Sequence, residues 1–170
     1  MITRRRFLEA ALVMSATAIA GLISGCAHPQ LIDYGSSEAQ IMKKLGNPHA
    51  RVEMPNGWVR LTYSWQPVGQ AVWWLFLDSS GHYAKLEQAL TEKNFPLVKP
   101  GMTQQAILEL FGPCAEIYRF AALKQTSFMY RYEDDMKTAM AFWVDFDASG
   151  HVISWSTSTD PWLDKPFPGI

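Results

Sequence analysis

Cysteine is scarce in this 170-residue chain, which contains only Cys26 and Cys114. Cys26 ends an N-terminal apolar run, so the remainder of the chain keeps a single thiol and cannot form an internal disulfide. Cys114 follows Gly112 and Pro113 and has no histidine near it in sequence, which predicts a buried, inert thiol. The fold must therefore be held together by packing alone.

The chain also lacks the motifs of common catalytic and metal sites. HxxxH and CxxC spacings, a glycine-rich phosphate loop and Gly-x-Ser-x-Gly are all absent. Asp145 and Asp147 would share one face of a strand, but Asp147 belongs to a predicted turn. The four histidines are scattered, and His82 and His151 occupy equivalent turn positions. The sequence therefore predicts a non-enzyme with no catalytic residues, no metal ligands and no cofactor.

An excess of positive charge is missing from the part of the chain that follows residue 25. There, twelve Lys and Arg residues stand against fifteen Asp and Glu residues, and no basic block occurs. A nucleic-acid-binding protein needs a basic patch or stripe to attract phosphates. Nucleic acid is therefore not an expected partner, while the chain after residue 25 is long enough to bury one substantial core.

The longest uncharged apolar run extends from Ala10 to Gly25 and follows three arginines at positions 4–6. It is too short and too rich in Ala, Ser and Gly to predict a bilayer span. A basic start, an apolar run and small residues at its end indicate a secretory signal peptide over residues 1–25. An uncleaved anchor helix is the alternative.

Ile23-Ser24-Gly25-Cys26 resembles a lipobox, in which a small residue precedes a lipid-accepting cysteine. The thiol of Cys26 would take a diacylglyceryl group, and a further acyl chain on the exposed amine would make the anchoring stable. Ala27 stands where an aspartate would retain the product at the inner membrane. The expected location is therefore the outer membrane, lipid-anchored on its periplasmic side. A chance cysteine after an ordinary signal peptide is the alternative.

Thr3-Arg4-Arg5-Arg6-Phe7-Leu8 also resembles the twin-arginine export signature, in which a receptor reads the arginine pair. Glu9 departs from the lysine that is usual at that place. The weakly hydrophobic run favours this route, and a generic basic start is the alternative.

The most informative feature is an internal repeat. The stretch GSSEAQIMKKLGNP (35–48) matches GMTQQAILELFGPC (101–114) at an offset of 66 residues. Each copy predicts a short helix that Ser37 or Thr103 caps, and Gln40 can complete a capping box in the first copy. The residues expected just past the two helix ends, with positive φ, are Gly46 and Gly112.

Strands with alternating apolar residues follow each predicted helix. Arg60–Trp65 corresponds to Phe128–Tyr132, and the stretch from Val72 matches the stretch from Ala141 at an offset of 69 residues. The last two stretches share Asp-x-Ser-Gly-His, which predicts a hairpin turn because Gly supplies a left-handed backbone and Asp and Ser bond the turn amides. A third strand follows in each copy.

The expected fold class is α+β. Two tandem units, each a helix plus a three-stranded antiparallel meander, would pack together because one unit alone has a marginal core. The predicted organisation is a signal peptide at 1–25, a lipidated N-terminal tether at 26–34, a first unit at 35–90, a linker at 91–100, a second unit at 101–159 and an extended C-terminal tail at 160–170.

Strand parity predicts which side chains face away from the helices. An apolar row occupies alternate positions over 142–146 and should face the helix, which turns Trp143 outward. The offset of 69 residues turns Trp74 and Phe76 outward in the first copy. Exposed aromatic residues mark interaction sites, and tryptophan often dominates binding energy. The candidate protein-binding face therefore consists of Trp74, Phe76 and Trp143, and the alternative is that the tail or the linker covers it.

Val98-Lys99-Pro100-Gly101-Met102-Thr103, continued by QQAILELFGPC, resembles the opening of the SmpA/OmlA family, typified by BamE. FWVDFDASGHVISW resembles the second hairpin of that family, so the resemblance covers about 99–155 and is looser in the first copy. It implies an α+β fold and a periplasm-facing lipoprotein that accompanies the machinery folding β-barrel proteins into the outer membrane. That assembly factor has one unit, whereas tandem units also resemble the β-lactamase inhibitory proteins, whose joined sheets form a concave protein-binding face.

Three functions are open at this point. The first is a non-enzymatic outer-membrane lipoprotein that is accessory to outer-membrane protein assembly or envelope maintenance through protein–protein contacts. The alternatives are an inhibitor or binder of a periplasmic enzyme and a small-ligand or lipid-binding module. The expected partners are the membrane, through the lipid anchor, and a periplasmic or outer-membrane protein, with the oligomeric state left open.

Overall fold

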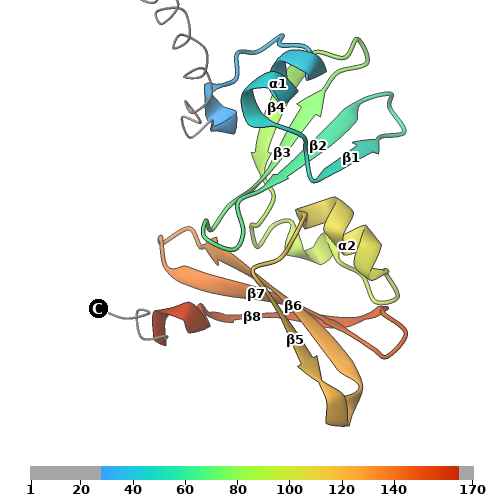
Figure 1. Cartoon of the computed structure of the whole chain (residues 1–170), viewed down its shortest axis with the longest axis vertical. Helices are drawn as coiled ribbons and strands as arrows, with labels where there is room; N and C mark the ends of the chain where they lie inside the picture. The colour runs from blue at the N-terminus through green and yellow to red at the C-terminus, as the bar shows by residue number, and fades with distance from the viewer. Residues whose placement is uncertain (1–27, 165–170) are drawn as a thin grey trace, which may run out of the picture.

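Two α-helices and two antiparallel sheets within residues 28–164 confirm the expected α+β class (Figure 1). The structure is a computed structural model that describes residues 28–164. The predicted signal peptide and Cys26 lie outside the described residues. In chain order the elements, with 3-10 helices written η, are η1 (Pro29–Leu31), α1 (Glu38–Leu45), β1 (Ala50–Glu53), β2 (Val59–Ser64), β3 (Val72–Leu77), β4 (Tyr83–Gln88), η2 (Phe95–Leu97), α2 (Gln104–Phe111), β5 (Glu116–Phe120), η3 (Ala121–Leu123), β6 (Gln125–Glu133), β7 (Ala139–Phe146), β8 (Val152–Thr159) and η4 (Pro161–Asp164).

Each unit has four strands, so the prediction of three strands is wrong. The sheet orders are β1-β2-β3-β4 and β5-β6-β7-β8, and neighbouring strands are antiparallel. The missed strands are the first of each sheet, β1 and β5. They read ARVE and EIYRF and have no fully buried residue, so they carry little of the apolar signal that reveals a strand. Pairing with β2 and β6 makes them strands.

The helix ends form as the repeat predicts. Ser37 Oγ accepts a hydrogen bond from Gln40 N at 3.4 Å, and Ser37 N donates to Gln40 Oε1 at 2.8 Å, which completes the capping box. Thr103 Oγ1 accepts a bond from the first turn of α2 at 3.2 Å. Gly46 and Gly112 follow the helices with φ of 82° and 69°, in the left-handed region that favours glycine.

The two Asp-x-Ser-Gly-His segments are hairpin turns, as expected. Asp78 Oδ1 accepts bonds from Ser80 N at 2.9 Å and His82 N at 3.1 Å. Asp147 Oδ1 makes the same two bonds within its own turn, at 2.9 and 3.0 Å. The serine hydroxyl and the turn amides lower the pKa of both carboxyls from the usual value. His82 and His151 therefore belong to the turns.

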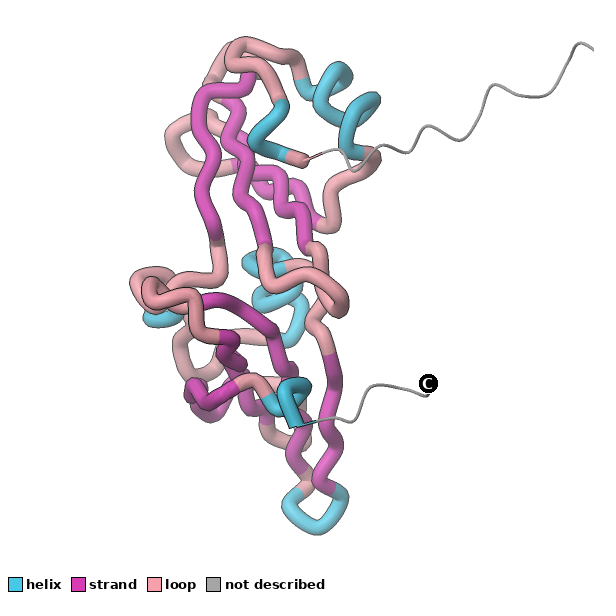
Figure 2. Tube along the Cα trace, turned by 90° about the vertical axis from the view of Figure 1, so that its left-hand side faces the viewer, coloured by secondary structure: helices cyan, strands magenta, loops and turns pink. Residues whose placement is uncertain are grey.

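The helices and sheets stack in alternating layers. α1 covers one face of the first sheet, and α2 lies between the two sheets, as Figures 1 and 2 show. The order is thus α1, first sheet, α2, second sheet, with apolar faces buried between successive layers. The residues buried in the cluster beneath α1 are Ile32, Ile41, Leu61, Tyr63, Leu75, Leu77 and Tyr83.

The larger core is shared by both units. It combines side chains of β3 in the first unit with side chains of α2, β6 and β7 in the second unit. Phe95 of the linker is 1% exposed, and its ring stacks on Phe142 with centroids 3.9 Å apart. This shared burial supports the expectation that the two units pack together, and the linker contributes to the same core.

The first residues of the predicted tail are not extended, so that expectation is wrong for 160–164. Asp160 is fully buried, and Pro161–Asp164 form η4. Asp160 Oδ2 accepts a hydrogen bond from Arg131 Nε at 2.7 Å, and Oδ1 accepts one from Trp162 N at 2.9 Å. A buried carboxylate needs such partners, and pairing with Arg131 holds this segment against the sheet. Residues 165–170 lie outside the described residues.

Candidate protein-binding site

Trp74 and Phe76 of the predicted binding face are buried. Trp74 is 3% exposed and Phe76 is 8% exposed. The Trp74 ring stacks on Phe111 of α2 with centroids 6.1 Å apart, and its Nε1 donates to the Leu110 carbonyl at 2.5 Å. Strand parity is confirmed, because both side chains point away from α1. The expectation that they are exposed is wrong, because α2 of the second unit covers Trp74 and Phe76 belongs to the same buried cluster.

Side chains of β2 bind the C-terminal end of α2. Thr62 Oγ1 and Arg60 Nη2 donate to the Glu109 carbonyl at 3.0 and 3.2 Å. Ser64 Oγ donates to the Pro113 carbonyl at 3.0 Å. The last carbonyls of a helix have no partner within that helix, so the two bonds to Glu109 satisfy an acceptor that burial would otherwise leave unpaired. The contact between the units is therefore a specific internal interface.

A second contact joins the β2–β3 loop to β6. Gln66 Nε2 donates to the Arg131 carbonyl at 2.7 Å, and Arg131 N donates to Gln66 Oε1 at 3.2 Å. Arg131 Nη1 donates to the Pro67 carbonyl at 3.1 Å, while Arg131 Nε binds the buried Asp160. The Trp162 ring lies 4.2 Å from the guanidinium carbon of Arg131. One arginine thus connects the first unit, the second unit and η4.

Trp143 lies on the outer face of the second sheet, which neither α1 nor α2 covers. Its ring centroid is 5.2 Å from that of Tyr118, and its Nε1 donates to Ser158 Oγ at 2.9 Å. The Tyr118 hydroxyl donates to Glu116, and this bond raises the pKa of Tyr118 to about 12. Trp143 is half-buried among these neighbours and is the member of the predicted face that stays at the surface.

The carboxylates of β7 serve local structure. Asp145 Oδ1 accepts a bond from Ser127 Oγ at 2.5 Å, and Oδ2 accepts one from Ser154 Oγ at 3.1 Å. Asp147 holds the following turn, as described above. The two carboxylates therefore have separate roles, in line with the interpretation that they are not an acid–base pair.

β8 forms an unprotected sheet edge beside Trp143. Its eight residues include no Lys, Arg or Pro, and all except Val152 are exposed. Ser156 lies directly opposite Trp143 in the register. An edge strand presents backbone N–H and C=O groups that can pair with another extended chain, and proteins commonly block such edges with charge, proline or shortness.

The other three sheet edges carry such protection. β1 has four residues, with Arg51 in ion pairs with two glutamates. β4 carries the ion pair between Lys85 and Glu87, and β5 has Arg119 within five residues. Sequence reasoning missed the β8 edge because alternation reveals the faces of a strand but not which strand ends a sheet.

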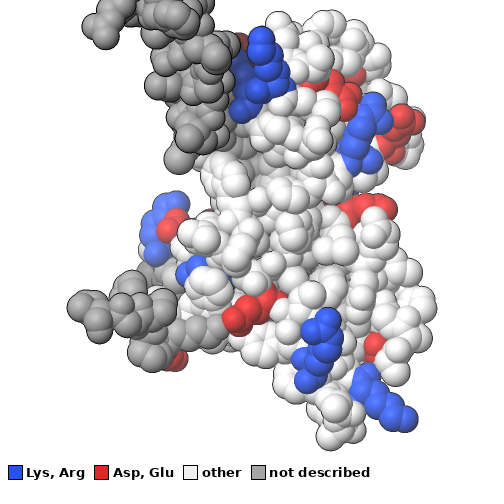
Figure 3. Space-filling model, viewed as in Figure 1, with Lys and Arg blue, Asp and Glu red and all other residues white. Residues whose placement is uncertain are grey.

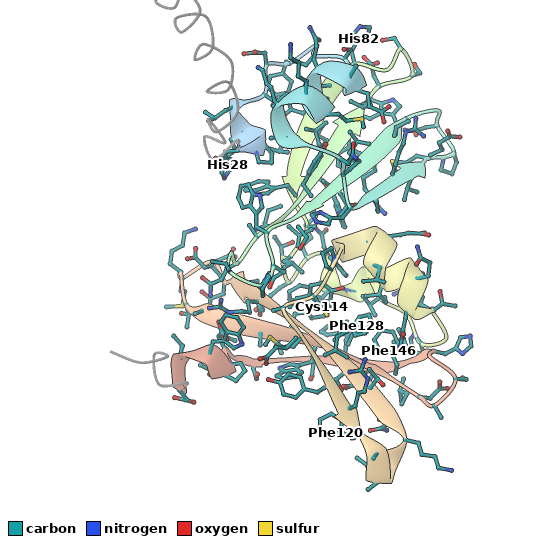
Figure 4. All side chains as sticks on the ribbon, viewed as in Figure 1. His28, His82, Cys114, Phe120, Phe128 and Phe146 are labelled. Carbon is teal, nitrogen blue, oxygen red and sulfur yellow. The ribbon has the colours of Figure 1, made fainter. Side chains whose placement is uncertain are left out.

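The remaining reactive groups form no evident site in residues 28–164. Cys114 is half-buried, and burial raises the pKa of its thiol to about 11, in agreement with an inert thiol. No three or more His, Cys, Asp or Glu side chains in this range gather to hold a metal ion. His28 and His82 lie well apart on the first unit (Figure 4). No helix of this range is long and apolar enough to cross a bilayer.

A surface depression of about 300 Å³ lies between the linker and the β6–β7 turn. Its lining is mostly polar or charged, unlike the apolar lining of most ligand pockets, and consists of Thr91, Glu92, Lys93, Tyr132, Glu133, Asp134, Asp135 and Met136. Figure 3 shows both charge signs scattered over one face with wide uncharged areas between them. That face has no field of one sign to attract a polyanion.

Comparison with known proteins returns structural neighbours only. No protein-family model and no curated protein matches the chain. A structure assigned to an osmotically inducible lipoprotein, OsmE, is 28% identical and covers 44% of this chain and 81% of its own, with a TM-score of 0.36. A DUF4309 family protein, YjgB, from Bacillus subtilis is 12% identical and covers 74% of this chain and 79% of its own, with a TM-score of 0.29.

A third structure, assigned to a β-lactamase inhibitor protein from Streptococcus mutans, is 11% identical. It covers 73% of this chain and 83% of its own, with a TM-score of 0.29. TM-scores this low establish neither a family nor a function, so the function proposed below rests on the chain's own residues.

Proposed function

We propose that the chain is a non-enzymatic outer-membrane lipoprotein, anchored through Cys26 and facing the periplasm. It is accessory to outer-membrane protein assembly or envelope maintenance and acts by binding a protein partner. The signal-peptide pattern and the lipobox support the anchor. The outer face of the second sheet around Trp143, together with the β8 edge, supports the protein contact.

The unprotected β8 edge is the observation that carries this proposal. An extended segment that pairs with β8 would gain backbone hydrogen bonds along the strand. Alternate side chains of that segment would lie on the face that contains Trp143 and Tyr118. Strands of an outer-membrane barrel alternate apolar and polar residues, and they have open edges until the barrel closes. Such a strand is the kind of partner that this site fits.

A photo-crosslinking residue in place of Ser156 tests the site in the full-length lipidated protein, because Ser156 lies opposite Trp143. We expect crosslinks to barrel-assembly subunits or to barrel proteins in transit. The same probe at Ser80, in the β3–β4 turn of the first unit, should give none. Trp143→Ala should weaken capture by about tenfold or more, the effect of losing a binding hot spot.

The pattern of crosslinks separates the possible functions. A single periplasmic hydrolase captured at Ser156 would support the enzyme-binding alternative. Equal crosslinking at Ser156 and Ser80 would contradict the proposed site. Undiminished capture by the Trp143→Ala variant would show that the face beside β8 does not contribute.

A further inference from the structure

An aromatic cluster lies where the described chain begins. The His28 ring centroid is 4.3 Å from that of Trp65 and 5.5 Å from that of Trp73, and the two tryptophans are 6.1 Å apart. Leu31 of η1 is 71% exposed, and Val68 of the β2–β3 loop is 85% exposed. We call these five residues, His28, Leu31, Trp65, Val68 and Trp73, the tether patch.

The two segments that form the tether patch are held in place by local hydrogen bonds. His28 Nδ1 accepts a bond from Gln30 N at 3.2 Å at the start of η1. In the β2–β3 loop, Trp65 N donates to the Ala71 carbonyl at 3.0 Å, and Gly69 N donates to the Trp65 carbonyl at 2.8 Å. Figures 1 and 4 show η1, the labelled His28 and this loop on the same side of the molecule.

The position of the tether patch along the chain places it close to the predicted anchor. Cys26 precedes His28 by two residues. An extended chain spans at most about 3.6 Å per residue, so these two residues lie within about 7 Å of each other. The headgroup layer on one side of a bilayer is about 5–8 Å thick. A lipid on Cys26 would therefore hold His28, the member of the tether patch that is nearest in sequence, at or next to the headgroups, and the rings of Trp65 and Trp73 lie against His28.

The chemistry of the tether patch suits that layer. Tryptophan is enriched at membrane–water interfaces because its ring has an apolar body and one polar N–H. Trp65 and Trp73 are both half-buried, and because Nε1 of Trp73 is itself buried, Trp73 offers the bilayer only part of its apolar ring. The loop from Trp65 to Ala71 contains no charged residue, and Val68 exposes its apolar side chain at the tip. Apolar groups beside a lipid anchor add their own buried apolar area to membrane binding.

Met136 provides a comparison within the same molecule. It is 86% exposed, as much as Val68, but it follows Asp134 and Asp135 in the β6–β7 turn. Carboxylates beside an anionic headgroup layer are repelled by it. Exposure alone does not distinguish the tether patch, whereas its closeness to Cys26 and its lack of charge do.

We propose that the tether patch rests on the bilayer surface when Cys26 is lipidated, with Trp65 and Trp73 at the level of the headgroups. This inference rests on the lipid anchor of the proposed function. It specifies which side of the first unit faces the membrane, and it assigns β8 and Trp143 of the second unit to a protein partner.

The test uses the full-length lipidated protein in vesicles of phosphatidylethanolamine and phosphatidylglycerol. A polarity-sensitive thiol dye is attached to Val68→Cys or, as the matched control, to Met136→Cys, each with Cys114→Ala. The lipid blocks the thiol of Cys26. We expect the dye at position 68 to shift to the blue and gain intensity on reconstitution, while the dye at position 136 changes little.

Tryptophan quenching by brominated phospholipids provides the second measurement. Vesicles that contain brominated lipid should quench part of the tryptophan emission of the unmodified protein. Trp65→Phe together with Trp73→Phe should abolish most of this quenching, whereas Trp143→Phe should preserve it. Thermal melting of the variants verifies that they are folded.

Flotation with the vesicles separates this inference from the proposed anchor. If the protein floats but the dye at position 68 responds no more than the dye at position 136, the tether patch does not contact the bilayer and the anchor stands. Quenching that survives in the double tryptophan variant has the same meaning. A protein that does not float, and whose Cys26 carries no lipid by mass spectrometry, overturns both proposals.

Discussion

The two sheets are built from equivalent strands, yet their outer faces have different surroundings. Trp74 on the first sheet is 3% exposed beneath α2, whereas its equivalent on the second sheet, Trp143, is half-buried at the surface. α2 contacts both sheets, and no further α-helix follows it within residues 28–164. Each repeat of a tandem protein contacts only its neighbours, so a terminal repeat has one face without a neighbour.

This difference shows how one sequence pattern takes two roles. In the first unit the outward tryptophan belongs to the core and donates to the Leu110 carbonyl of α2. In the second unit the equivalent side chain donates to Ser158 of β8, beside an exposed sheet edge. Trp74 therefore helps to hold the two units together, whereas Trp143 forms part of the surface on which the proposed function rests.

Replacing each tryptophan by alanine tests the difference between the two outer faces most directly. Trp74→Ala should lower the free energy of unfolding by about 3–5 kcal/mol, because it leaves a cavity in the shared core. Trp143→Ala should cost about 1 kcal/mol, because its side chain is only half-buried. Urea denaturation of both variants measures the difference. Equal losses would mean that the two outer faces are not different environments.

Removal of the ion pair between Arg131 and Asp160 should have an effect of similar size to Trp74→Ala. Asp160→Ala should cost about 3–5 kcal/mol in unfolding free energy, because it leaves the arginine, whose side chain is 13% exposed, without its partner. Asp33→Ala is the matched control, since Asp33 is 84% exposed and pairs with Lys44 at the surface. That control should cost about 0–1 kcal/mol. Similar losses in denaturant titrations would contradict a structural role for Asp160.

The glycines that follow the two helices differ in the same way between the units. A β-carbon at Gly112 would lie 2.9 Å from Ser64 Cβ across the contact between the units, whereas one at Gly46 meets no atom within 4 Å. Gly46→Ala should cost about 1 kcal/mol, the strain of a left-handed residue. Gly112→Ala should cost about 2–3 kcal/mol, because strain and the clash add. Melting temperatures that fall equally would show that Ser64 moves aside easily.

His49 gives the smallest expected effect, through pH. Burial lowers the pKa of His49 below its usual 6.5. Its Nδ1 accepts a hydrogen bond from Ser64 N at 3.1 Å, beside Gly112. The unfolded state therefore takes up a proton first as the pH falls, so stability is complete above about 6.5 and declines below it.

The measurement is the melting temperature as a function of pH for the unmodified protein and for His49→Gln. The variant cannot titrate at this position, so its profile should be flatter below pH 6.5. The change should be small, because His49 is partly exposed and solvent screens its charge. Identical profiles would exclude His49 as a source of pH dependence.

Features that depend on nearby residues could be predicted from the sequence. Ser37 and Thr103 cap their helices because each lies three residues from an amide that needs an acceptor. The shared Asp-x-Ser-Gly-His segments form turns because the partners of each aspartate lie within four residues of it. Strand parity at Trp74 and Trp143 was also predictable, because side chains alternate along any strand.

Features that depend on residues far apart in the chain could be found only in the tertiary structure. The burial of Trp74 depends on Leu110 and Phe111, which belong to a helix of the other unit. Asp160 is buried because Arg131, on β6, supplies a partner. β8 is an open edge because the sheet order places no described strand beyond it.

The repeat, the helix ends, the turns and the inward and outward faces of the strands therefore follow from the sequence alone, because backbone preferences and hydrogen bonds over a few residues decide them. Which outward face is core and which lies at the surface is visible only in the folded molecule. That choice depends on how the two similar units stack. The burial of apolar area drives the stacking, but it has no direction, so the apolar pattern of a strand does not reveal which outward face the other unit will cover.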